Sequence, residues 1–564
     1  MLAASVERAF GEQIITTLID CTLQQSAADC TEQILSQHPE VVGLSMTVWN
    51  RDLALDIAHR LKIIRPDLIL LAGGPEVTAT PNSLLQNRDL DLILTGEGEQ
   101  KLVAALGDML HGQKPNASAL LATESIADLG DLPSPYLTGL LRPTRDGGVL
   151  WELSRGCPYR CDFCFESRGS AMVRRFPVER VRAELQLFAS AGVNEVFVLD
   201  PTFNYHKETA KELLKIMADD GQGLHFSLEI RAELIDQELA ELFASIDCSL
   251  QIGLQSADAA VLRLINRDFD HEEFTDKVLF LHQAGVSYGF DLIYGLPGDT
   301  LAGFLASLDF ALGLIPNHLD IFPLSVLPGT RLADTASGLG LEYQSQAPYR
   351  VHSSTSFSAA EMTQAARIGA ACDFFYNRGR AVPWFAIILD GLELSPSEFF
   401  SRFAKVLPET LPADPLPLQQ SFVSDQFEHR GQSEVAALAV DLIAYFGAVE
   451  PLLAPPAVKS KPDSTSGKLY LNPHSIFVHF NHDPQQLLQH LADDITDLQE
   501  LAFFVPRVDC DYFCYIFQDS LQFYPLNPVQ SAYLKSLVSS TPATAPSPDF
   551  VAVALESGIL FRLR

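Results

Sequence analysis

The sequence has no apolar run approaching the roughly 18 residues that a membrane-spanning helix needs. Its first residues, MLAASVERAFGEQ, lack the basic start and apolar core of a signal peptide, so we expect a cytoplasmic protein without a membrane partner. Basic residues are scarce, with 39 Lys and Arg against 71 Asp and Glu, for a formal net charge of −32. Such a surface repels phosphate backbones, which argues against nucleic acid as a partner.

Cysteine is also scarce, yet three of the 9 cysteines, Cys157, Cys161 and Cys164, follow one another in the spacing CxxxCxxC. Thiolates are soft ligands of iron–sulfur clusters and of zinc. A closed structural zinc site needs four protein ligands, and the next histidine, His206, is distant. Three thiolates suit a [4Fe–4S] cluster with one open iron, while structural zinc and a cluster that only transfers electrons are the alternatives. We expect Cys510 and Cys514 to be core residues, and a second metal-binding pair is the alternative.

The cysteine motif, with Phe163 before its last cysteine, resembles that of the radical S-adenosylmethionine (SAM) superfamily. The resemblance implies that the three cysteines hold a [4Fe–4S] cluster whose open iron chelates SAM. It further implies that the reduced cluster cleaves SAM to a 5′-deoxyadenosyl radical, which abstracts hydrogen from a small-molecule or peptide substrate. The electron would come from a one-electron donor such as a flavodoxin or ferredoxin.

Apolar strand-like segments alternate with helical patterns between residues 150 and 340, which predicts a partial (β/α)6 barrel. The expected strands are 150–154, 195–199, 225–230, 249–254, 287–294 and 320–326. Polar residues follow these strands, as in LDPTFN, EIRAE and GLQS, and they match radical SAM barrels. By that resemblance the SAM-binding residues are Phe163, Asp200, Pro201, Thr202, Glu229, Arg231, Gln255, Ser256, Asp291, Ile293 and Gly295.

Residues 1–125 alternate strand and helix in the manner of a doubly wound, Rossmann-like parallel sheet. The expected strands are 14–19, 41–48, 68–72 and 90–94, with helices at 2–10, 27–36, 51–64 and 100–110. The ordered segments GLSMTVWN, LAGGPE and LTGEGE resemble the cobalamin-binding domain that precedes many radical SAM cores. By that resemblance the cobalamin-binding residues are Ser45, Thr47, Trp49, Gly73, Gly74, Pro75, Glu76, Gly96, Glu97 and Gly98.

Cobalamin-binding domains of this kind usually begin with one further strand, which we expect this domain to lack. No DxHxxG motif supplies a histidine ligand for cobalt. Despite these two absences, cobalamin is an expected cofactor, beside the [4Fe–4S] cluster and SAM. The alternative is a domain that binds no cobalamin and only packs on the core.

The remaining segments are expected to be a linker at 126–149, a mostly helical domain at 341–454, a second linker at 455–468 and a small α+β module at 469–564. The last module has some likeness to a winged-helix or peptide-clasping module, and a cap over the open barrel is the alternative. The sequence and its resemblance thus predict an α/β radical SAM enzyme that abstracts hydrogen from an unknown substrate and, if cobalamin is bound, carries out methyl transfer or cyclisation. A non-catalytic cobalamin-binding or partner-binding accessory protein is the rival hypothesis.

Overall fold

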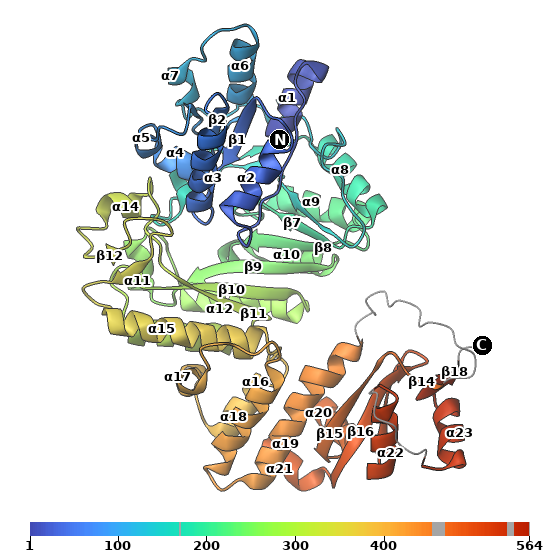
Figure 1. Ribbon diagram of the computed structural model, residues 1–564. Helices are drawn as coiled ribbons and strands as arrows, with labels where there is room; N and C mark the ends of the chain where they lie inside the picture. Colours follow the sequence, from blue (N-terminus) through green and yellow to red (C-terminus); the bar gives the residue numbers. More distant parts are fainter. Residues whose placement is uncertain (169–170, 454–468, 539–545, 563–564) are drawn as a thin grey trace. The chain divides into compact units, whose positions relative to one another are not determined.

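The computed structural model describes residues 1–168, 171–453, 469–538 and 546–562 (Figure 1). The chain divides into two compact units, of which the first comprises Met1–Pro316 and Asp320–Ala366. The second comprises Asn317–Leu319 and Arg367–Arg564.

The first unit opens with a three-stranded parallel sheet of order β1-β2-β3, which confirms the expected α/β architecture. Its strands are β1 (Val41–Ser45), β2 (Ile69–Gly73) and β3 (Leu92–Ile93). The helices are α1 (Leu2–Phe10), α2 (Ala27–Leu35), α3 (Arg51–Ile64), α4 (Pro75–Ala79), α5 (Pro81–Leu84), α6 (Glu99–Leu110) and α7 (Ala117–Leu120). Buried residues of α2, α3 and the strands, among them Ile34, Ala58 and Leu70, form one apolar core.

The expected strand at 14–19 is wrong. This segment forms no ladder with the three described strands, and Ile15 is 89% exposed while Leu18 is 53% exposed. A β-strand is held by hydrogen bonds to a neighbouring strand, so β-branched residues alone do not make one.

The central part of the first unit is a six-stranded sheet of order β11-β10-β9-β8-β7-β4, in which the neighbours from β4 to β10 run parallel. Its strands are β4 (Gly148–Trp151), β7 (Glu195–Val198), β8 (His225–Ile230), β9 (Cys248–Gln255), β10 (Ser287–Tyr294) and β11 (His318–Pro323). The connecting helices are α8 (Val178–Ala191), α9 (Lys207–Asp220), α10 (Gln237–Ala244), α11 (Ala259–Leu264), α12 (His271–Gln283), α13 (Leu301–Gly313) and α14 (Arg331–Thr335). The predicted partial barrel is confirmed.

The expected first barrel strand is interrupted. It ends at Trp151, and β5 (Ser154–Arg155) pairs instead with β6 (Arg174–Arg175) in an antiparallel ladder. This short ladder closes the loop that carries the three cysteines, and Gly156 opens that loop at φ 99°, a conformation that favours glycine. After the barrel come β12 (Glu342–Tyr343), β13 (Val351–Ser353) and α15 (Ala359–Cys372).

Alternate residues of the central sheet face either the helices or the barrel lumen. On the helix side, the Trp151 ring lies 5.8 Å from that of Phe188 on α8, and its indole N–H donates to Glu184. On the opposite face, Leu150 is 59% exposed and Phe197 is 39% exposed. The lumen of the barrel is therefore open.

The second unit begins with helices and ends with small antiparallel sheets. Its helices are α16 (Phe385–Leu392), α17 (Pro396–Val406), α18 (Leu416–Glu428), α19 (Ser433–Ala444), α20 (Pro484–Ala492), α21 (Leu498–Phe504), α22 (Pro528–Ser536) and α23 (Pro548–Glu556). Strands β15 (Ser475–His482), β16 (Arg507–Phe517) and β17 (Ser520–Leu526) form one sheet, and β14 (Leu469–Leu471) pairs with β18 (Leu560–Arg562). Cys514 is fully buried in this module, and Cys510 packs against the same core cluster. The linker predicted at 455–468 lies outside the described residues.

Ser433–Leu453 is long and apolar enough to cross a membrane by length and composition alone. That is weak evidence, because the core helix of a globular domain passes the same test. Here Leu438 and Leu442 on α19 are fully buried, and α19 contacts both α18 and β15. The segment behaves as a core helix of the second unit.

Candidate functional site

The three-cysteine loop is fixed by hydrogen bonds to other barrel loops. The Asp162 N–H donates to Ile265 O at 3.0 Å, and its own carbonyl accepts the Leu332 N–H at 2.9 Å. The Asn266 side chain donates to Arg160 O at 2.7 Å. Residues at the end of α11 and in α14 therefore hold the cysteine segment at the rim of the barrel.

Cys157 and Cys164 are half-buried, Cys161 is buried, and none of the three forms a disulfide in the part of the chain that the structure describes. Burial raises the pKa of the Cys157 thiol, while hydrogen bonds from the Tyr159 backbone and the Thr202 side chain oppose that rise. Donors that favour the thiolate therefore surround a group that must lose its proton to bind metal.

No group of three His, Cys, Asp or Glu side chains among the described residues is arranged to hold a metal ion, and this includes the cysteine triad. In a [4Fe–4S] cubane each cysteine binds a different iron, so its three sulfurs stand farther apart than those around a single ion. Three soft donors on one loop thus fit a cubane better than a zinc ion, which needs four ligands around one point.

Two arginine side chains, those of Arg231 and Arg267, lie near the cysteine loop. The guanidinium of Arg231, a predicted SAM-binding residue, lies 3.8 Å from the centroid of the Tyr159 ring and pairs with Glu233. Burial lowers the pKa of Arg267, whose guanidinium donates to Gly253 O, and the nearby Cys161 and Glu233 oppose that lowering. Sequence reasoning missed Arg267 because it follows a short helix outside any motif.

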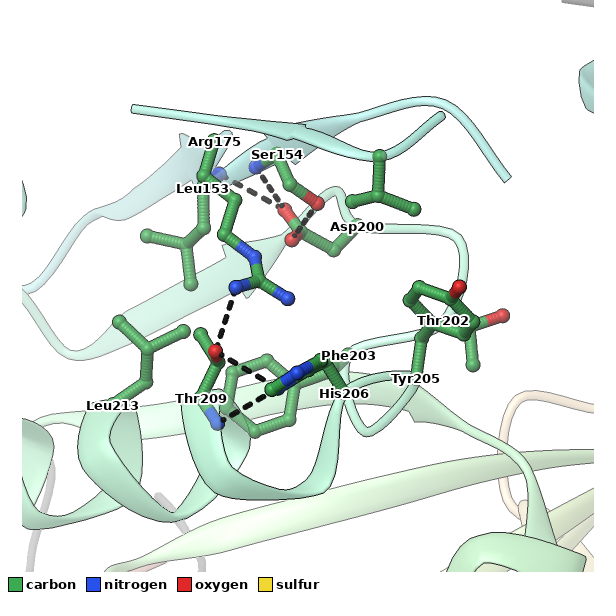
Figure 2. Close-up of a pocket in the computed structure, with 11 residues that line it drawn as sticks. Leu153, Ser154, Arg175, Asp200, Thr202, Phe203, Tyr205, His206, Thr209 and Leu213 are labelled. Carbon is green, nitrogen blue, oxygen red and sulfur yellow. Dashed lines mark hydrogen bonds between the residues drawn. The ribbon is translucent and has the colours of Figure 1, made fainter. Parts of the chain in front are cut away.

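Asp200, predicted to contact SAM, is bound by the protein itself. Its carboxylate accepts hydrogen bonds from the N–H groups of Leu153 and Ser154, at 2.9 and 3.0 Å, and from the Ser154 hydroxyl (Figure 2). It is 5% exposed, and burial raises its pKa to about 6. The carboxylate therefore ties the end of β7 to the segment between β4 and β5. Thr202, two residues after Asp200 and next to Pro201, lies beside Cys157.

The remaining predicted SAM residues lie at different places on the barrel rim. Glu229 faces the lumen from β8, and burial together with the nearby Glu166 raises its pKa. Ser256 is 1% exposed, and its hydroxyl accepts a hydrogen bond from the Asp258 N–H at 3.1 Å, so it serves the loop.

For the other predicted residues, contact with SAM stays a prediction. Phe163 and Ile293 are half-buried, and Asp291 and Gln255 face the lumen side of β10 and β9. A side chain at Gly295 would lie 2.7 Å from the end of Met362, so α15 covers this turn.

The predicted cobalamin residues at the ends of the first sheet fall into two groups. Ser45 and Trp49 are exposed, and the buried Thr47 hydroxyl has no hydrogen-bond partner in the described residues. Gly74 and Gly96 instead approach protein. A Cβ on Gly74, where φ is 110°, would lie 2.5 Å from Met46 O, and one on Gly96 would lie 3.3 Å from a backbone atom of Thr123.

The other predicted cobalamin-binding glycines and Pro75 also pack against other residues of the chain. A Cβ on Gly73 would contact Leu94, and a Cβ on Gly98 would contact the side chain of Leu2, which lies on α1. Pro75 occupies the first position of α4. These glycines allow close chain packing at the strand ends.

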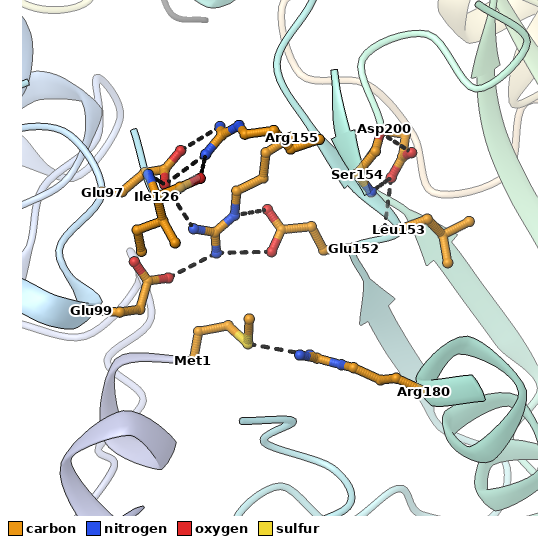
Figure 3. A network of polar contacts seen from close by, with 11 residues as sticks. Met1, Glu97, Glu99, Ile126, Glu152, Leu153, Ser154, Arg155, Arg180 and Asp200 are labelled. Atoms are coloured by element: carbon orange, nitrogen blue, oxygen red, sulfur yellow. Dashed lines mark hydrogen bonds and ion pairs between the residues drawn. The ribbon is translucent and has the colours of Figure 1, made fainter. Parts of the chain in front are cut away.

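Two predicted cobalamin residues, Glu76 and Glu97, pair with side chains inside the first unit. Glu76 is 4% exposed and contacts both Arg51 and the hydroxyl of Tyr349, which follows the barrel. Glu97 pairs with Arg174 of β6 at 2.6 Å. It also accepts the Ile126 N–H (Figure 3). The hydrogen bonds of Arg174 hold the pKa of Glu97 below its ordinary value despite burial.

Arg155, next to the cysteine loop, completes this network. Its guanidinium pairs with Glu152 and with Glu99 of α6, both at 2.8 Å, and lies 3.7 Å from Glu97 (Figure 3). The segment GEGE, which sequence reasoning assigned to cobalamin, therefore links the first sheet to both ends of the cysteine loop.

Two family models match this chain. The model of the radical SAM superfamily matches residues 151–311, and that of the B12 binding domain matches residues 1–106. Their order along the chain agrees with the two α/β parts of the first unit.

Several curated proteins are about a quarter identical to the chain over the segment that aligns with it. The cobalamin-dependent radical SAM methyltransferase TokK of Streptomyces tokunonensis is 27% identical over 52% of this chain and 48% of its own length. A 2-(S-pantetheinyl)-carbapenam-3-carboxylate methyltransferase of Streptantibioticus cattleyicolor is 27% identical over 57% of this chain and 51% of its length. The chain thus spans about half the length of these two relatives.

Among solved structures, the cobalamin-dependent SAM radical enzyme OxsB, with aqua-cobalamin and SAM bound, matches with a TM-score of 0.53. The match covers 79% of this chain and 75% of OxsB at 16% identity, which shows a shared fold. Fold and site together define an α/β protein in which a Rossmann-like sheet precedes a partial barrel with a three-cysteine rim. Residues 151–311 of this protein are thus similar to the radical SAM superfamily, and residues 1–106 are similar to the B12 binding domain.

Proposed function

We propose that the chain is a cobalamin-dependent radical SAM enzyme that transfers a methyl group to an organic substrate. The observation that carries the proposal is the cysteine triad on a rim loop of the barrel, tied by Arg155 and Arg174 to the B12-binding domain. The methyltransferase names of TokK and of the carbapenam enzyme support this choice over a cyclisation.

The residues of the chain have distinct tasks in this proposal. Cys157, Cys161 and Cys164 would hold the [4Fe–4S] cluster, which supplies the electron for SAM cleavage, while cobalamin supplies a methyl carrier. Arg267 and Arg231 place positive charge next to the thiolates. Such charge lowers the energy of the anionic cluster and makes its reduction easier.

The open lumen supports a substrate that enters the barrel rather than one that binds outside it. Its wall carries exposed apolar residues on β4 and β7 and polar residues on β8 to β11. None of the nine cysteines forms a disulfide in the described residues, which supports our expectation of a reducing, cytoplasmic compartment.

The test is anaerobic reconstitution of the chain with iron and sulfide, followed by SAM and dithionite. We expect about four irons per chain, a corrinoid absorption spectrum after addition of hydroxocobalamin, and formation of S-adenosylhomocysteine or 5′-deoxyadenosine from SAM. Cys161→Ala should lose iron and SAM cleavage, whereas the matched variant Cys510→Ser, on a half-buried cysteine of the second unit, should keep both. SAM cleavage by Cys161→Ala would refute the assignment.

The same experiment separates the two rival functions. An accessory protein would bind cobalamin without cleaving SAM, and a cluster that only transfers electrons would show a reversible redox couple without binding SAM.

A further inference from the structure

Polar side chains meet at one end of the central sheet, where β8, β9 and β10 begin. Ser227, Ser249 and Ser287 are register partners on these three parallel strands, and all three are half-buried. Register partners of a parallel sheet point to the same face, so the three hydroxyl groups form a row. The cysteine loop follows β4 and therefore lies beyond the opposite end of the strands.

His225 and Asp247 form a hydrogen-bonded chain with Ser249. His225 stands two residues before Ser227 on β8, so its ring lies on the side of the serine row. Its Nδ1 lies 2.8 Å from Asp247 Oδ1, and its Nε2 lies 3.0 Å from Ser249 Oγ. Both distances are those of hydrogen bonds, so carboxylate, imidazole and hydroxyl group follow one another in contact.

The carboxylate of Asp247 fixes the direction of these hydrogen bonds. An ionised carboxylate only accepts, so the proton of the neutral His225 ring is on Nδ1, which donates to Asp247. Nε2 then keeps its lone pair and accepts the hydrogen of the Ser249 hydroxyl group. In this arrangement a histidine acts as general base on a serine, while the carboxylate holds the ring.

The hydrogen-bonded chain is open to solvent and has a free donor beside it. The His225 side chain is 32% exposed, and that of Asp247 is 75% exposed. The hydroxyl group of Ser287 has no hydrogen-bond partner within the described residues, whereas Ser227 donates to Glu195 at 3.3 Å. A serine hydroxyl group next to a reacting carbonyl group can donate to the oxyanion that develops there.

We propose that Ser249 is an activated nucleophile that accepts the acyl group of a small carboxylic ester, with His225 as its general base and Asp247 as the residue that positions His225. This activity needs neither the cluster nor SAM, which the cysteine loop would hold at the other end of the strands. Because Asp247 is mostly exposed, water and salt screen its charge, and we expect hydrolysis to be slow.

The reaction balances without an oxidant, a reductant or a metal. Ser249 Oγ bonds to the carbonyl carbon of the ester while its proton moves to His225 Nε2. The bond between that carbon and the alcohol oxygen then breaks, and the alcohol leaves with the proton from Nε2. Water attacks the acyl-serine in the same way, which releases the carboxylic acid and restores the hydroxyl group of Ser249.

The test treats the full chain with diisopropyl fluorophosphate, which modifies activated serines, and identifies the modified peptides by mass spectrometry. We expect Ser249 to react at least about a hundredfold faster than Ser245, an exposed serine that donates to Leu242 O at 2.6 Å. His225→Ala should remove this preference. Asp247→Asn should slow the modification of Ser249, and Asp247→Glu, which keeps a carboxylate, should restore most of the rate.

Hydrolysis of p-nitrophenyl acetate gives a second measurement. Ser249→Ala should lower it to the level of the chain unfolded in urea, whereas the matched control Ser245→Ala should keep both the hydrolysis and the modification of Ser249. Equal modification of Ser249 and Ser245 in the wild-type protein would overturn the inference, and this comparison stands even if a variant fails to fold. Rapid modification of Ser249 in folded His225→Ala would also overturn it, because His225 would then not be the base.

Discussion

The pairing of Glu97 with Arg174 predicts that Glu97→Gln destabilises the protein even when no cofactor is present. Arg174 has a side chain only 6% exposed, and Glu97 is 19% exposed. Their contact is bidentate, with N–O distances of 2.6 and 3.0 Å. Breaking a buried pair by neutralising one partner typically costs about 3–5 kcal/mol, because the other charge stays buried.

Two features of the site reduce that cost. A glutamine keeps an acceptor for the Ile126 N–H, and Arg174 still donates to Ile126 O. We therefore expect a loss of about 2–3 kcal/mol in the free energy of unfolding of the first unit. Urea unfolding of the cofactor-free protein, followed anaerobically by circular dichroism, measures it, and Glu32→Gln on the exposed face of α2 is the matched control.

The experiment also decides between two roles for Glu97. If its carboxylate binds cobalamin, as the resemblance of the sequence implies, the variant should unfold within about 0.5 kcal/mol of wild type but bind cobalamin more weakly. That result would refute the structural role. A destabilised variant would instead show that GEGE joins the B12-binding domain to the cysteine loop.

Two further predictions concern stability. Burial raises the pKa of Asp299, which is 2% exposed, from 3.8 to about 7. Folding therefore favours the protonated carboxyl group, and the free energy of unfolding falls as the pH rises from about 4 through 7. Asp299→Asn should therefore raise the free energy of unfolding most at pH 8, by up to about 4 kcal/mol, and less at pH 5, and an equal effect at both pH values would contradict this origin. Gly74→Ala should lower the free energy of unfolding by about 1–3 kcal/mol or more, since φ is 110° and the new Cβ would lie 2.5 Å from Met46 O. Gly43→Ala, with open space around the new Cβ, should lower the free energy of unfolding by less than about 1 kcal/mol.

Local sequence patterns predicted the barrel strands well. The bounds of β8 and β10 agree with the prediction, because apolar and polar residues alternate along β8 and most residues of β10 are apolar or aromatic. The pattern failed at 14–19, where the residues suit a strand but no described strand pairs with them. It also missed the β5–β6 ladder, since two-residue strands carry no periodicity.

Side-chain partners distant in sequence could not be predicted. Glu97 pairs with Arg174, which follows it by 77 residues, and Glu76 contacts Tyr349 across 273 residues. Both glutamates stand in motifs that suggest a ligand, and neither motif contains its partner. The three-cysteine spacing was different, because all of its chemistry lies within one loop.

For Asp200, the family resemblance predicts the position of the residue but not the partners of its carboxylate. Its turn lies beside Cys157, where Thr202 contacts the thiol, as expected for a turn that meets SAM. Its carboxylate, however, accepts three hydrogen bonds from Leu153 and Ser154 and so has little capacity left for an amino group. If this turn binds the SAM amino group, backbone carbonyls and the Thr202 hydroxyl must provide the acceptors, while Asp200 fixes the strand that leads into the cysteine loop. The resemblance therefore places Asp200 near the cysteines, and its hydrogen bonds show that the carboxylate holds the cysteine loop.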